Sequence, residues 1–217
     1  MIQHGRLTFV QWKAWKGPWL TIGNGQQTVA RLSSTTKKQI EICILAGGLS
    51  SRMGRDKAAL RLGNRTMLSM VRSAARISGY AVRVIRRDVV PRCGPLGGVL
   101  TGLMTSSAER VVFLACDMPF VTAELLIHVI KKTRSDRALF IAKQSKVGFP
   151  FVLPTSAREL VSKQIEKGEL SLHELARRLG AEKLKVPQKF SGELENVNTP
   201  AKYQWARKRN SRFSSLF

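Results

Sequence analysis

The chain of 217 residues is long enough for one domain of ordinary size with a substantial core. Its formal net charge of +23 favours anionic substrates or partners, and three cysteines without paired spacing argue against a disulfide scaffold or a zinc site. No apolar run approaches the roughly 18 residues of a membrane span, so we expect a cytosolic protein with reduced cysteines and no membrane contact.

Residues 1–39 show no periodic pattern. Trp12, Trp15 and Trp19 stand among Gly, Gln, Ser and Thr, and the segment lacks the apolar centre of a secretory signal. Its basic and hydroxyl residues are also found in transit peptides, although amphipathic periodicity is poor. A translation start assigned too far upstream would look the same. We predict a basic, poorly ordered extension that activity does not require.

Basic residues are concentrated at both ends of the chain. Residues 1–40 contain six Lys or Arg and residues 201–217 contain five, with no acid in either segment. Residues 41–200 hold 26 basic and 14 acidic residues, so this part is basic as well. Weak, non-specific nucleic-acid binding is therefore expected. Nucleic-acid binding as the main function stays an alternative, although no RNP aromatic pair, zinc finger or recognition helix is evident.

A glycine-rich loop follows the first apolar run. Ile40–Leu45 predicts a buried strand, and Gly47 and Gly48 then allow a tight turn and close approach to a ligand. Small hydroxyl residues come next, and Arg52 and Lys57 bring positive charge to the same loop. Such a loop is suited to a polyphosphate. The spacing matches neither Walker A nor the dinucleotide fingerprint, and a glycine turn with solvated charges is the alternative.

The remainder alternates strand and helix signals, which is typical of an α/β fold with a largely parallel sheet. Strands are expected at Val82–Ile85, Val111–Cys116, Ala138–Ala142, Phe149–Leu153 and Leu184–Val186, the third and fourth as neighbours. Val111–Cys116 is the most apolar run and is expected near the centre of the sheet. Helices are expected from about Leu68 to Gly79, over Gly98–Thr105, after Thr122, after the capping boxes Ser156/Glu159 and Ser171/Glu174, and from Pro200.

Asp117 directly follows the most apolar run, just as the glycine loop follows Ile40–Leu45. In a parallel sheet both would emerge at the carboxyl edge, where ligands bind. A carboxylate there can hold Mg²⁺, which prefers oxygen ligands and substrate phosphates. The alternative is a structural carboxylate at the N-terminus of the helix that Thr122 caps.

Four segments, in order, resemble motifs of the molybdenum cofactor guanylyltransferase family. The family's loop pattern LAGGxSxRMGxDK is matched by Leu45, Ala46, Gly47, Gly48, Ser50, Arg52, Met53, Gly54, Asp56 and Lys57. The later matches are residues 94–98 (GPLGG), 114–119 (LACDMP) and 196–200 (NVNTP). The resemblance covers residues 40–206 and implies a GT-A-like nucleotidyltransferase fold, three-layer α/β/α with a mostly parallel sheet. The extension at 1–39 and a basic tail at 207–217 would flank this domain.

The resemblance also implies roles for individual residues. Lys57, with Arg52 as helper, would neutralise charge as pyrophosphate leaves the α-phosphorus. Asp117 would hold Mg²⁺, the cofactor implied. The nucleotide would contact Leu45, Ala46, Gly47, Gly48, Lys57, Asp88, Gly94, Pro95, Leu96 and Asp117.

Two of these assignments have structural alternatives. Asp88 could equally be an ion-pair partner of Arg86, Arg87 or Arg92. Asn196 and Asn198 match paired asparagines that lie near the acceptor and the catalytic centre, but they could also form a plain turn before Pro200.

One departure from the family lies between the first helix and Asp88. Only Gly79-Tyr80-Ala81 separates helix from strand, where longer relatives insert a strand, a helix and an Asn that helps to hold the nucleotide. The loss shortens one sheet edge and leaves guanine specificity open. Arg86 or Arg87 could substitute, although no motif supports this.

The function implied is Mg²⁺-dependent transfer of GMP from GTP to the phosphate of molybdopterin, giving molybdopterin guanine dinucleotide and pyrophosphate. Partners would be GTP, molybdopterin and, beyond these, molybdoenzyme apoproteins or other cofactor-biosynthesis proteins. Alternatives are a related nucleotidyltransferase that uses CTP or a sugar phosphate, and a non-catalytic nucleotide-binding adaptor. Retention of both Lys57 and Asp117 argues against the adaptor.

Overall fold

The computed structural model describes residues 39–47, 57–134, 136–143 and 146–214, with the backbone alone for Lys57 and for residues 212–214. The predicted extension up to residue 38, Gly48 and Arg52 lie outside the described residues, as does the side chain of Lys57. Within the described ranges, no helix combines the length and the apolar character needed to cross a bilayer.

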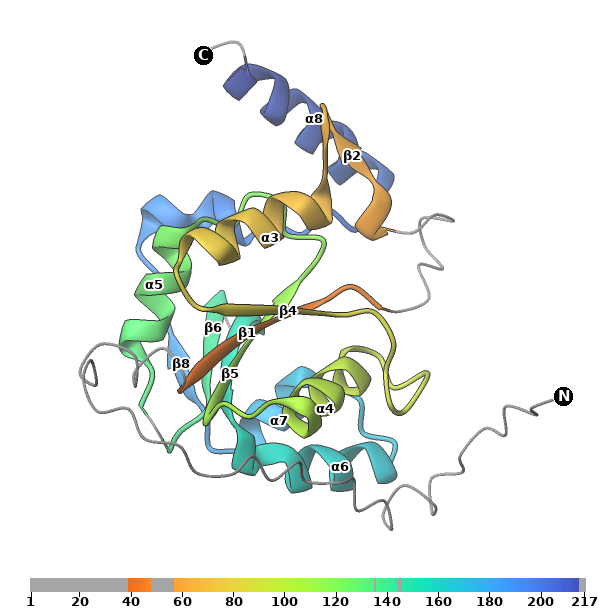
Figure 1. The fold of residues 1–217 in the computed structure, drawn as a ribbon, viewed down its shortest axis with the longest axis vertical. Helices are drawn as coiled ribbons and strands as arrows, with labels where there is room; N and C mark the ends of the chain where they lie inside the picture. The colour runs from red at the N-terminus through yellow and green to blue at the C-terminus, as the bar shows by residue number, and fades with distance from the viewer. Residues whose placement is uncertain (1–38, 48–56, 135, 144–145, 215–217) are drawn as a thin grey trace, which may run out of the picture.

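Six strands form one sheet: β1 (Ile40–Leu45), β4 (Ala81–Ile85), β5 (Arg110–Ala115), β6 (Leu139–Lys143), β7 (Lys146–Pro154) and β8 (Glu182–Leu184). Their order across the sheet is β4-β1-β5-β7-β6-β8 (Figure 1). All pairings are parallel except those of β7, which runs antiparallel to β5 and β6. The predicted, mostly parallel sheet is confirmed, and β5 is an interior strand that is buried at every position but its last.

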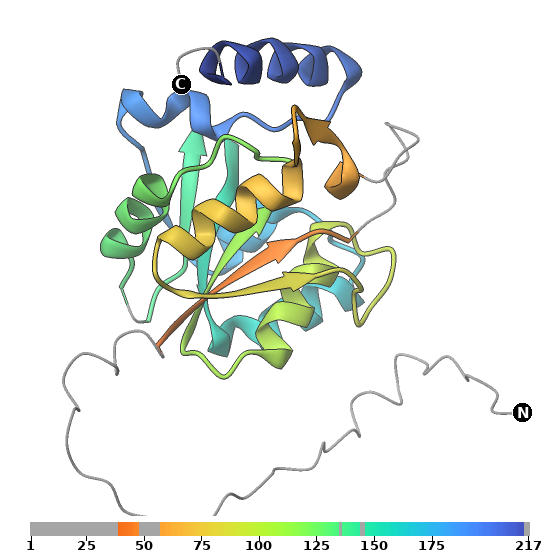
Figure 2. The same ribbon diagram turned by 45° about the horizontal axis from the view of Figure 1, so that its top comes forward.

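Helices cover both faces of the sheet and complete three layers (Figures 1 and 2). One face carries α3 (Met67–Ile77) and α5 (Ala123–Lys132), and the other carries α4 (Pro95–Thr105), α6 (Arg158–Glu166) and α7 (Leu172–Arg178). Because side chains alternate across a strand, β1 serves two cores. Ile42 and Ile44 pack under α3 and α5, whereas Cys43 packs under α4, α6 and α7.

A smaller unit lies beside these layers. The 3-10 turn η1 (Lys57–Ala59) leads into a hairpin of β2 (Arg61–Leu62) and β3 (Arg65–Thr66), and α8 (Pro200–Ser214) packs beside it (Figure 1). Leu62, Met67, Val197 and Ala206 bury together there. Helix α8 continues through residues 207–214, which the sequence analysis assigned to a separate tail.

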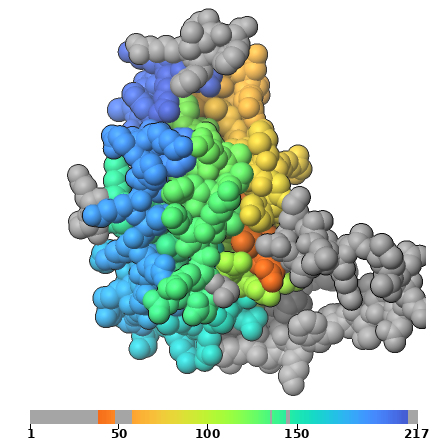
Figure 3. All heavy atoms as spheres, turned by 90° about the vertical axis from the view of Figure 1, so that its left-hand side faces the viewer, coloured from red at the N-terminus to blue at the C-terminus, as the bar shows by residue number. Residues whose placement is uncertain are grey.

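The last connection before α8 runs along α5. It contains the 3-10 segment η3 (Gln188–Leu194), and Figure 3 shows this blue segment lying against the green helix. The ring of Phe190 lies 5.5 Å from that of His128 on α5, and the Lys189 ammonium donates to Glu124 at 2.5 Å. These contacts position the chain that returns to the sheet at Val197.

Two of the three helix N-caps predicted from the sequence are formed in the structure. The Thr122 hydroxyl accepts the Leu125 N–H at 3.2 Å, and the Ser171 hydroxyl accepts from two N–H groups of α7. The predicted capping box at Ser156 is wrong. The Thr155 N–H and hydroxyl both donate to the Glu109 carbonyl, so the chain leaves β7 in a 3-10 turn, η2 (Thr155–Ala157), and α6 begins at Arg158 without a side-chain cap.

Predicted boundaries shift by one residue at β5 and β6, and β7 begins at Lys146 rather than Phe149. Two further shifts have a visible cause. Helix α4 begins at Pro95 rather than Gly98, because proline is favoured at the first helical position and Gly94, with φ +56°, supplies the reversal before it. The last strand lies at Glu182–Leu184, two residues before the predicted range, because the Glu182 N–H donates to the Ala138 carbonyl at 2.9 Å.

All three cysteines, Cys43, Cys93 and Cys116, are free and buried, which agrees with the predicted reduced state. Burial raises the pKa of the Cys43 thiol to about 12, so this thiol stays protonated and serves as a small apolar core residue.

Candidate active site

The carboxyl ends of three neighbouring strands meet at one edge of the sheet. Leu45, the last residue of β1, pairs with Ile85 of β4 on one side and with Ala115 of β5 on the other. The Ala46 N–H then donates to the Ile85 carbonyl at 2.8 Å, and the Cys116 N–H donates to the Leu45 carbonyl at 3.1 Å. The loops that follow β1, β4 and β5 therefore start side by side (Figure 2).

Three glycines enclose the carboxylate of Asp88, the half-buried residue three positions after β4. A Cβ atom built at Gly47, Gly97 or Gly98 would lie 3.5, 2.9 or 3.3 Å from the nearest carboxylate oxygen. A side chain at Gly97 would collide outright, so the backbone of the loop after β1 and of the first turn of α4 approaches this carboxylate as closely as it does only because side chains are absent. We call Gly47, Gly97, Gly98 and Asp88 the glycine cradle.

The Asp88 carboxylate faces the cradle and is not neutralised. Among the described residues it takes part in no ion pair, so the pairing with Arg86, Arg87 or Arg92 that the sequence left open is not formed there. Burial raises the pKa of the Asp88 carboxyl. A half-buried carboxylate that forms no ion pair with the described residues is suited to accept hydrogen bonds from a ligand.

The loop that carries Asp88 is anchored to α4 by a residue that the sequence analysis overlooked. The buried Thr101 hydroxyl accepts the Val89 N–H at 2.9 Å and donates to the Gly97 carbonyl at 2.8 Å. One signal could have revealed it, since Thr101 is the lone hydroxyl in the apolar run from 96 to 103. The anchor holds Asp88 against the first turn of the helix.

Residues 94–98 form the start of α4 rather than a free loop. Gly94 is exposed, Pro95 is half-buried and Leu96 is fully buried, so a ligand can meet the backbone of Gly94 and the ring of Pro95 but not the side chain of Leu96. The first N–H groups of α4, and the positive end of its dipole, therefore lie next to the glycine cradle. Leu45 closes the other side, since a Cβ at Gly98 would lie 3.1 Å from its side chain.

Asp117 lies at the same edge, two residues beyond β5, and is half-buried. Its carbonyl accepts the Val197 N–H at 2.7 Å. Because Val197 is fully buried in the small unit with Leu62 and Met67, this bond holds the flanking Asn196 and Asn198 beside Asp117. Two motifs about eighty residues apart are thus joined by one backbone hydrogen bond.

The sequence left open that Asp117 is a structural carboxylate at the N-terminus of α5. In the structure, a different carboxylate, that of Glu193, bonds to Thr122 at this helix end. Glu193 of η3 accepts both the Thr122 N–H, at 3.1 Å, and the Thr122 hydroxyl, at 2.7 Å. Burial raises the pKa of Glu193, and these two hydrogen bonds oppose that rise. Helix α5 therefore receives its terminal carboxylate from Glu193.

The ligands available at this edge suit a hard cation that takes few ligands from the protein and the others from substrate and water. Within the described ranges, no group of three or more His, Cys, Asp or Glu side chains gathers as a metal cage. Asp117 is a carboxylate at an edge where a phosphate ligand would meet it, and one or two carboxylates with substrate phosphates are the usual ligands of Mg²⁺.

Lys57 is the first residue of η1 and directly precedes the buried Ala58. Its backbone is therefore fixed next to the core of the domain. Its side chain, like Arg52 and Gly48, falls outside what the structure describes. Their predicted roles stay predictions.

Known proteins share both the sequence pattern and the fold. The sequence profile of the MobA-like NTP transferase domain matches residues 42–88 and 72–186. A molybdenum cofactor guanylyltransferase of Shewanella halifaxensis is 29% identical over 189 residues, which are 76% of this chain and 92% of that protein.

Solved structures agree on the fold. Molybdopterin-guanine dinucleotide biosynthesis protein A of Archaeoglobus fulgidus superposes with a TM-score of 0.64 at 21% identity, covering 79% of this chain and 99% of that one. The 2-C-methyl-D-erythritol 4-phosphate cytidylyltransferase of Thermus thermophilus gives 0.61 at 17% identity, with 80% and 99% covered. A Mycobacterium tuberculosis protein in complex with manganese gives 0.55 at 20% identity, with 78% and 98% covered.

The profile match spans more than half of the chain and includes the ends of β1, β4 and β5, where the glycine cradle and Asp117 lie. The chain belongs to the MobA-like NTP transferase domain family of nucleotidyltransferases.

Proposed function

We propose that the chain is a molybdenum cofactor guanylyltransferase, which transfers GMP from GTP to the phosphate of molybdopterin and releases pyrophosphate. The observation that carries the proposal is the meeting of the glycine cradle and Asp117 at one edge of the sheet. The Shewanella halifaxensis relative supports the choice of guanine and of this acceptor.

The cradle offers a physical reason for selecting guanine. Guanine presents two adjacent donors, the ring N1–H and the exocyclic amine, to one carboxylate, which can accept both. Adenine and cytosine place a ring acceptor beside their amine, and a carboxylate would repel it. Asp88, which forms no ion pair among the described residues and is enclosed by backbone, would therefore select guanine although the Asn of longer relatives has no counterpart.

Transfer requires an in-line displacement at the α-phosphorus. An oxygen of the acceptor phosphate forms the new bond to phosphorus as the bond to the β-phosphate oxygen breaks, and pyrophosphate carries away the electron pair. Lys57 and Arg52 would neutralise the charge that develops, and Asn196 and Asn198 would orient the acceptor. Asp117 would hold Mg²⁺, which when bound draws charge from the triphosphate. The remaining rate enhancement would come from alignment of the two phosphates.

The test is release of pyrophosphate from each of the four nucleoside triphosphates with molybdopterin as acceptor. We expect turnover with GTP, and loss of at least a hundredfold in kcat for Asp117→Ala with the fold intact by circular dichroism. A clear preference for CTP would falsify the guanylyl assignment. Tight GTP binding without turnover would instead identify a nucleotide-binding adaptor, and an Asp117→Ala variant with near wild-type kcat would remove Asp117 from the metal site.

A further inference from the structure

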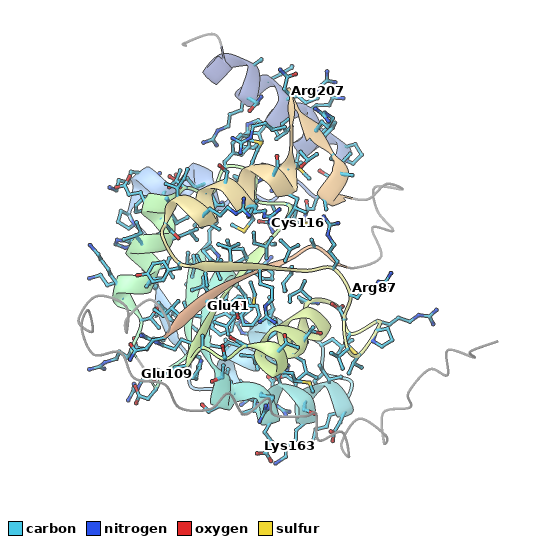
Figure 4. The ribbon with its side chains drawn as sticks, in the orientation of Figure 1. Glu41, Arg87, Glu109, Cys116, Lys163 and Arg207 are labelled. Atoms are coloured by element: carbon cyan, nitrogen blue, oxygen red, sulfur yellow. The ribbon has the colours of Figure 1, made fainter. Side chains whose placement is uncertain are left out.

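Three arginines surround Asp88 in the loop between β4 and α4. Arg86 and Arg87 follow directly after the last residue of β4, and Arg92 precedes the start of α4 by three residues. The Arg86 carbonyl lies 2.9 Å from the position of a Cβ at Gly47, so this backbone touches the glycine cradle itself. Figure 4 shows Arg87 beyond the end of β4, on the side where β1 also ends.

Within the described part of the chain, the guanidinium groups of Arg86, Arg87 and Arg92 make no ion pair and no hydrogen bond, and all three residues are exposed. A basic cluster between α6 and α7 differs. A surface pocket of about 530 Å³ between α6 and α7 is lined by Lys163, Lys167, Arg177 and Arg178, but Lys163 pairs with Glu159 at 2.8 Å and Arg177 pairs with Glu174 at 2.6 Å.

Among the described residues, no ion pair therefore compensates the charge of these three guanidinium groups. Asp88 is the one acid between residues 86 and 92, and its carboxylate lies against the three glycines of the cradle. The N-terminus of α4 adds positive potential at the same place. An anion bound here would relieve the repulsion among the guanidinium groups, and a guanidinium fork matches the oxygens of a phosphate.

We propose that Arg86 and Arg87 form a phosphate-binding rim on the glycine cradle, which positions a phosphate group of a substrate. The proposal rests on the proposed function for the identity of that substrate. Both substrates of the proposed reaction carry phosphate, so the group bound by the rim belongs either to the triphosphate of GTP or to the acceptor. The rim gives this shortened chain a nucleotide or acceptor contact in place of the Asn that it lacks.

The experiment compares the double variant Arg86→Ala/Arg87→Ala with the matched control Arg72→Ala/Arg76→Ala. The control removes the same charge from exposed positions on α3, whose last turn leads to the opposite edge of the sheet. Dissociation constants are measured for GTP, guanosine and inorganic tripolyphosphate, together with the KM of the acceptor and kcat. Arg86→Lys/Arg87→Lys is included because it keeps the charge and loses the fork.

If the rim contacts the triphosphate, the Kd of GTP and of tripolyphosphate should rise about tenfold in the alanine variant and that of guanosine should not change. If it contacts the acceptor, the acceptor KM should rise about tenfold with GTP binding intact. The lysine variant should recover part of the loss in either case. No change beyond that of the control overturns the proposal. Rim-dependent tripolyphosphate binding without pyrophosphate release by the wild type would refute the proposed function and leave the rim in place.

Discussion

Gly97 is the residue at which the candidate site leaves least room. A Cβ there would lie 2.7 Å from the Val90 carbonyl oxygen, a backbone atom, and 2.9 Å from the Asp88 carboxylate. Gly97→Ala should therefore push the loop outward, lower stability by about 1–3 kcal/mol and weaken GTP binding at least tenfold. Gly148→Ala is the matched control, because a Cβ there meets nothing within 4 Å. The free energy of unfolding in urea and the Kd of GTP are measured for both variants. Equal values for the two variants would contradict the close packing of Gly97 against Asp88.

The burial of Asp88 predicts a pH-dependent contribution to the stability of the fold. Burial raises the pKa of its carboxyl above the ordinary 3.8, so the folded protein binds this proton more tightly than the unfolded chain does. Ionised Asp88 therefore destabilises the fold at neutral pH, and this effect vanishes as the pH falls below 3.8.

The variant Asp88→Asn should thus have a higher Tm than the wild type at pH 7, and the difference should close between pH 7 and about pH 3. GTP binding should weaken, because the amide keeps one acceptor oxygen but presents a donor where guanine needs the second acceptor. Thermal denaturation across this pH range checks the first part. A lower Tm for the variant at pH 7 would assign Asp88 a structural role instead.

At the scale of elements, the two predicted capping boxes differ in the structure. The Ser171 hydroxyl accepts two N–H groups of α7, whereas Ser156 lies in η2 and caps nothing. Ser171→Ala should lower the free energy of unfolding by about 1 kcal/mol, and Ser156→Ala by less than about 0.5 kcal/mol. Chemical denaturation of both variants checks this. A larger loss at Ser156 would contradict the start of α6 at Arg158.

Apolar runs predicted most strands and helices because a run of apolar residues indicates a buried segment. The runs Ile40–Leu45 and Val111–Cys116 supply the interior strands β1 and β5, whose side chains pack on both faces of the sheet, so their character does not depend on distant residues. The start of α6 was missed because it follows from the bonds of Thr155 to the Glu109 carbonyl, and nothing local to Ser156 encodes them.

The residue pattern alone predicted the site only to the level of a sheet edge, and the family resemblance added Asp88, Asn196 and Asn198 to it. Parallel strands place Gly47 and Asp117 together by topology alone. The position of the Asp88 carboxylate depends instead on how closely Gly47, after β1, and Gly97 and Gly98, in the first turn of α4, approach it, which no spacing in the chain reveals. The bond from Val197 to Asp117 likewise joins segments whose separation in sequence gives no hint of contact.

For the whole molecule, the two basic ends should behave differently when removed. The family profile begins at residue 42, so deletion of residues 1–38 should weaken salt-dependent DNA binding and spare pyrophosphate release. The sequence predicted the same for residues 207–217, but Arg209 lies 4.3 Å from the Phe120 ring centroid and donates to the Gly192 carbonyl at 2.9 Å.

Truncation after residue 206 should therefore lower the free energy of unfolding by roughly 2 kcal/mol. Filter binding to duplex DNA at several salt concentrations, the pyrophosphate assay and urea unfolding separate these effects. Loss of catalysis on deletion of residues 1–38, or full stability after removal of residues 207–217, would contradict this account of the ends.

The most direct measurement is a crystal structure with GTP and Mg²⁺ bound. The account predicts guanine in the glycine cradle beside Asp88, the phosphates directed toward Lys57, and an Asp117 carboxylate oxygen about 2.1 Å from the metal. A nucleotide bound away from the ends of β1, β4 and β5, or Lys57 and Asp117 too far apart to contact one triphosphate, would contradict it.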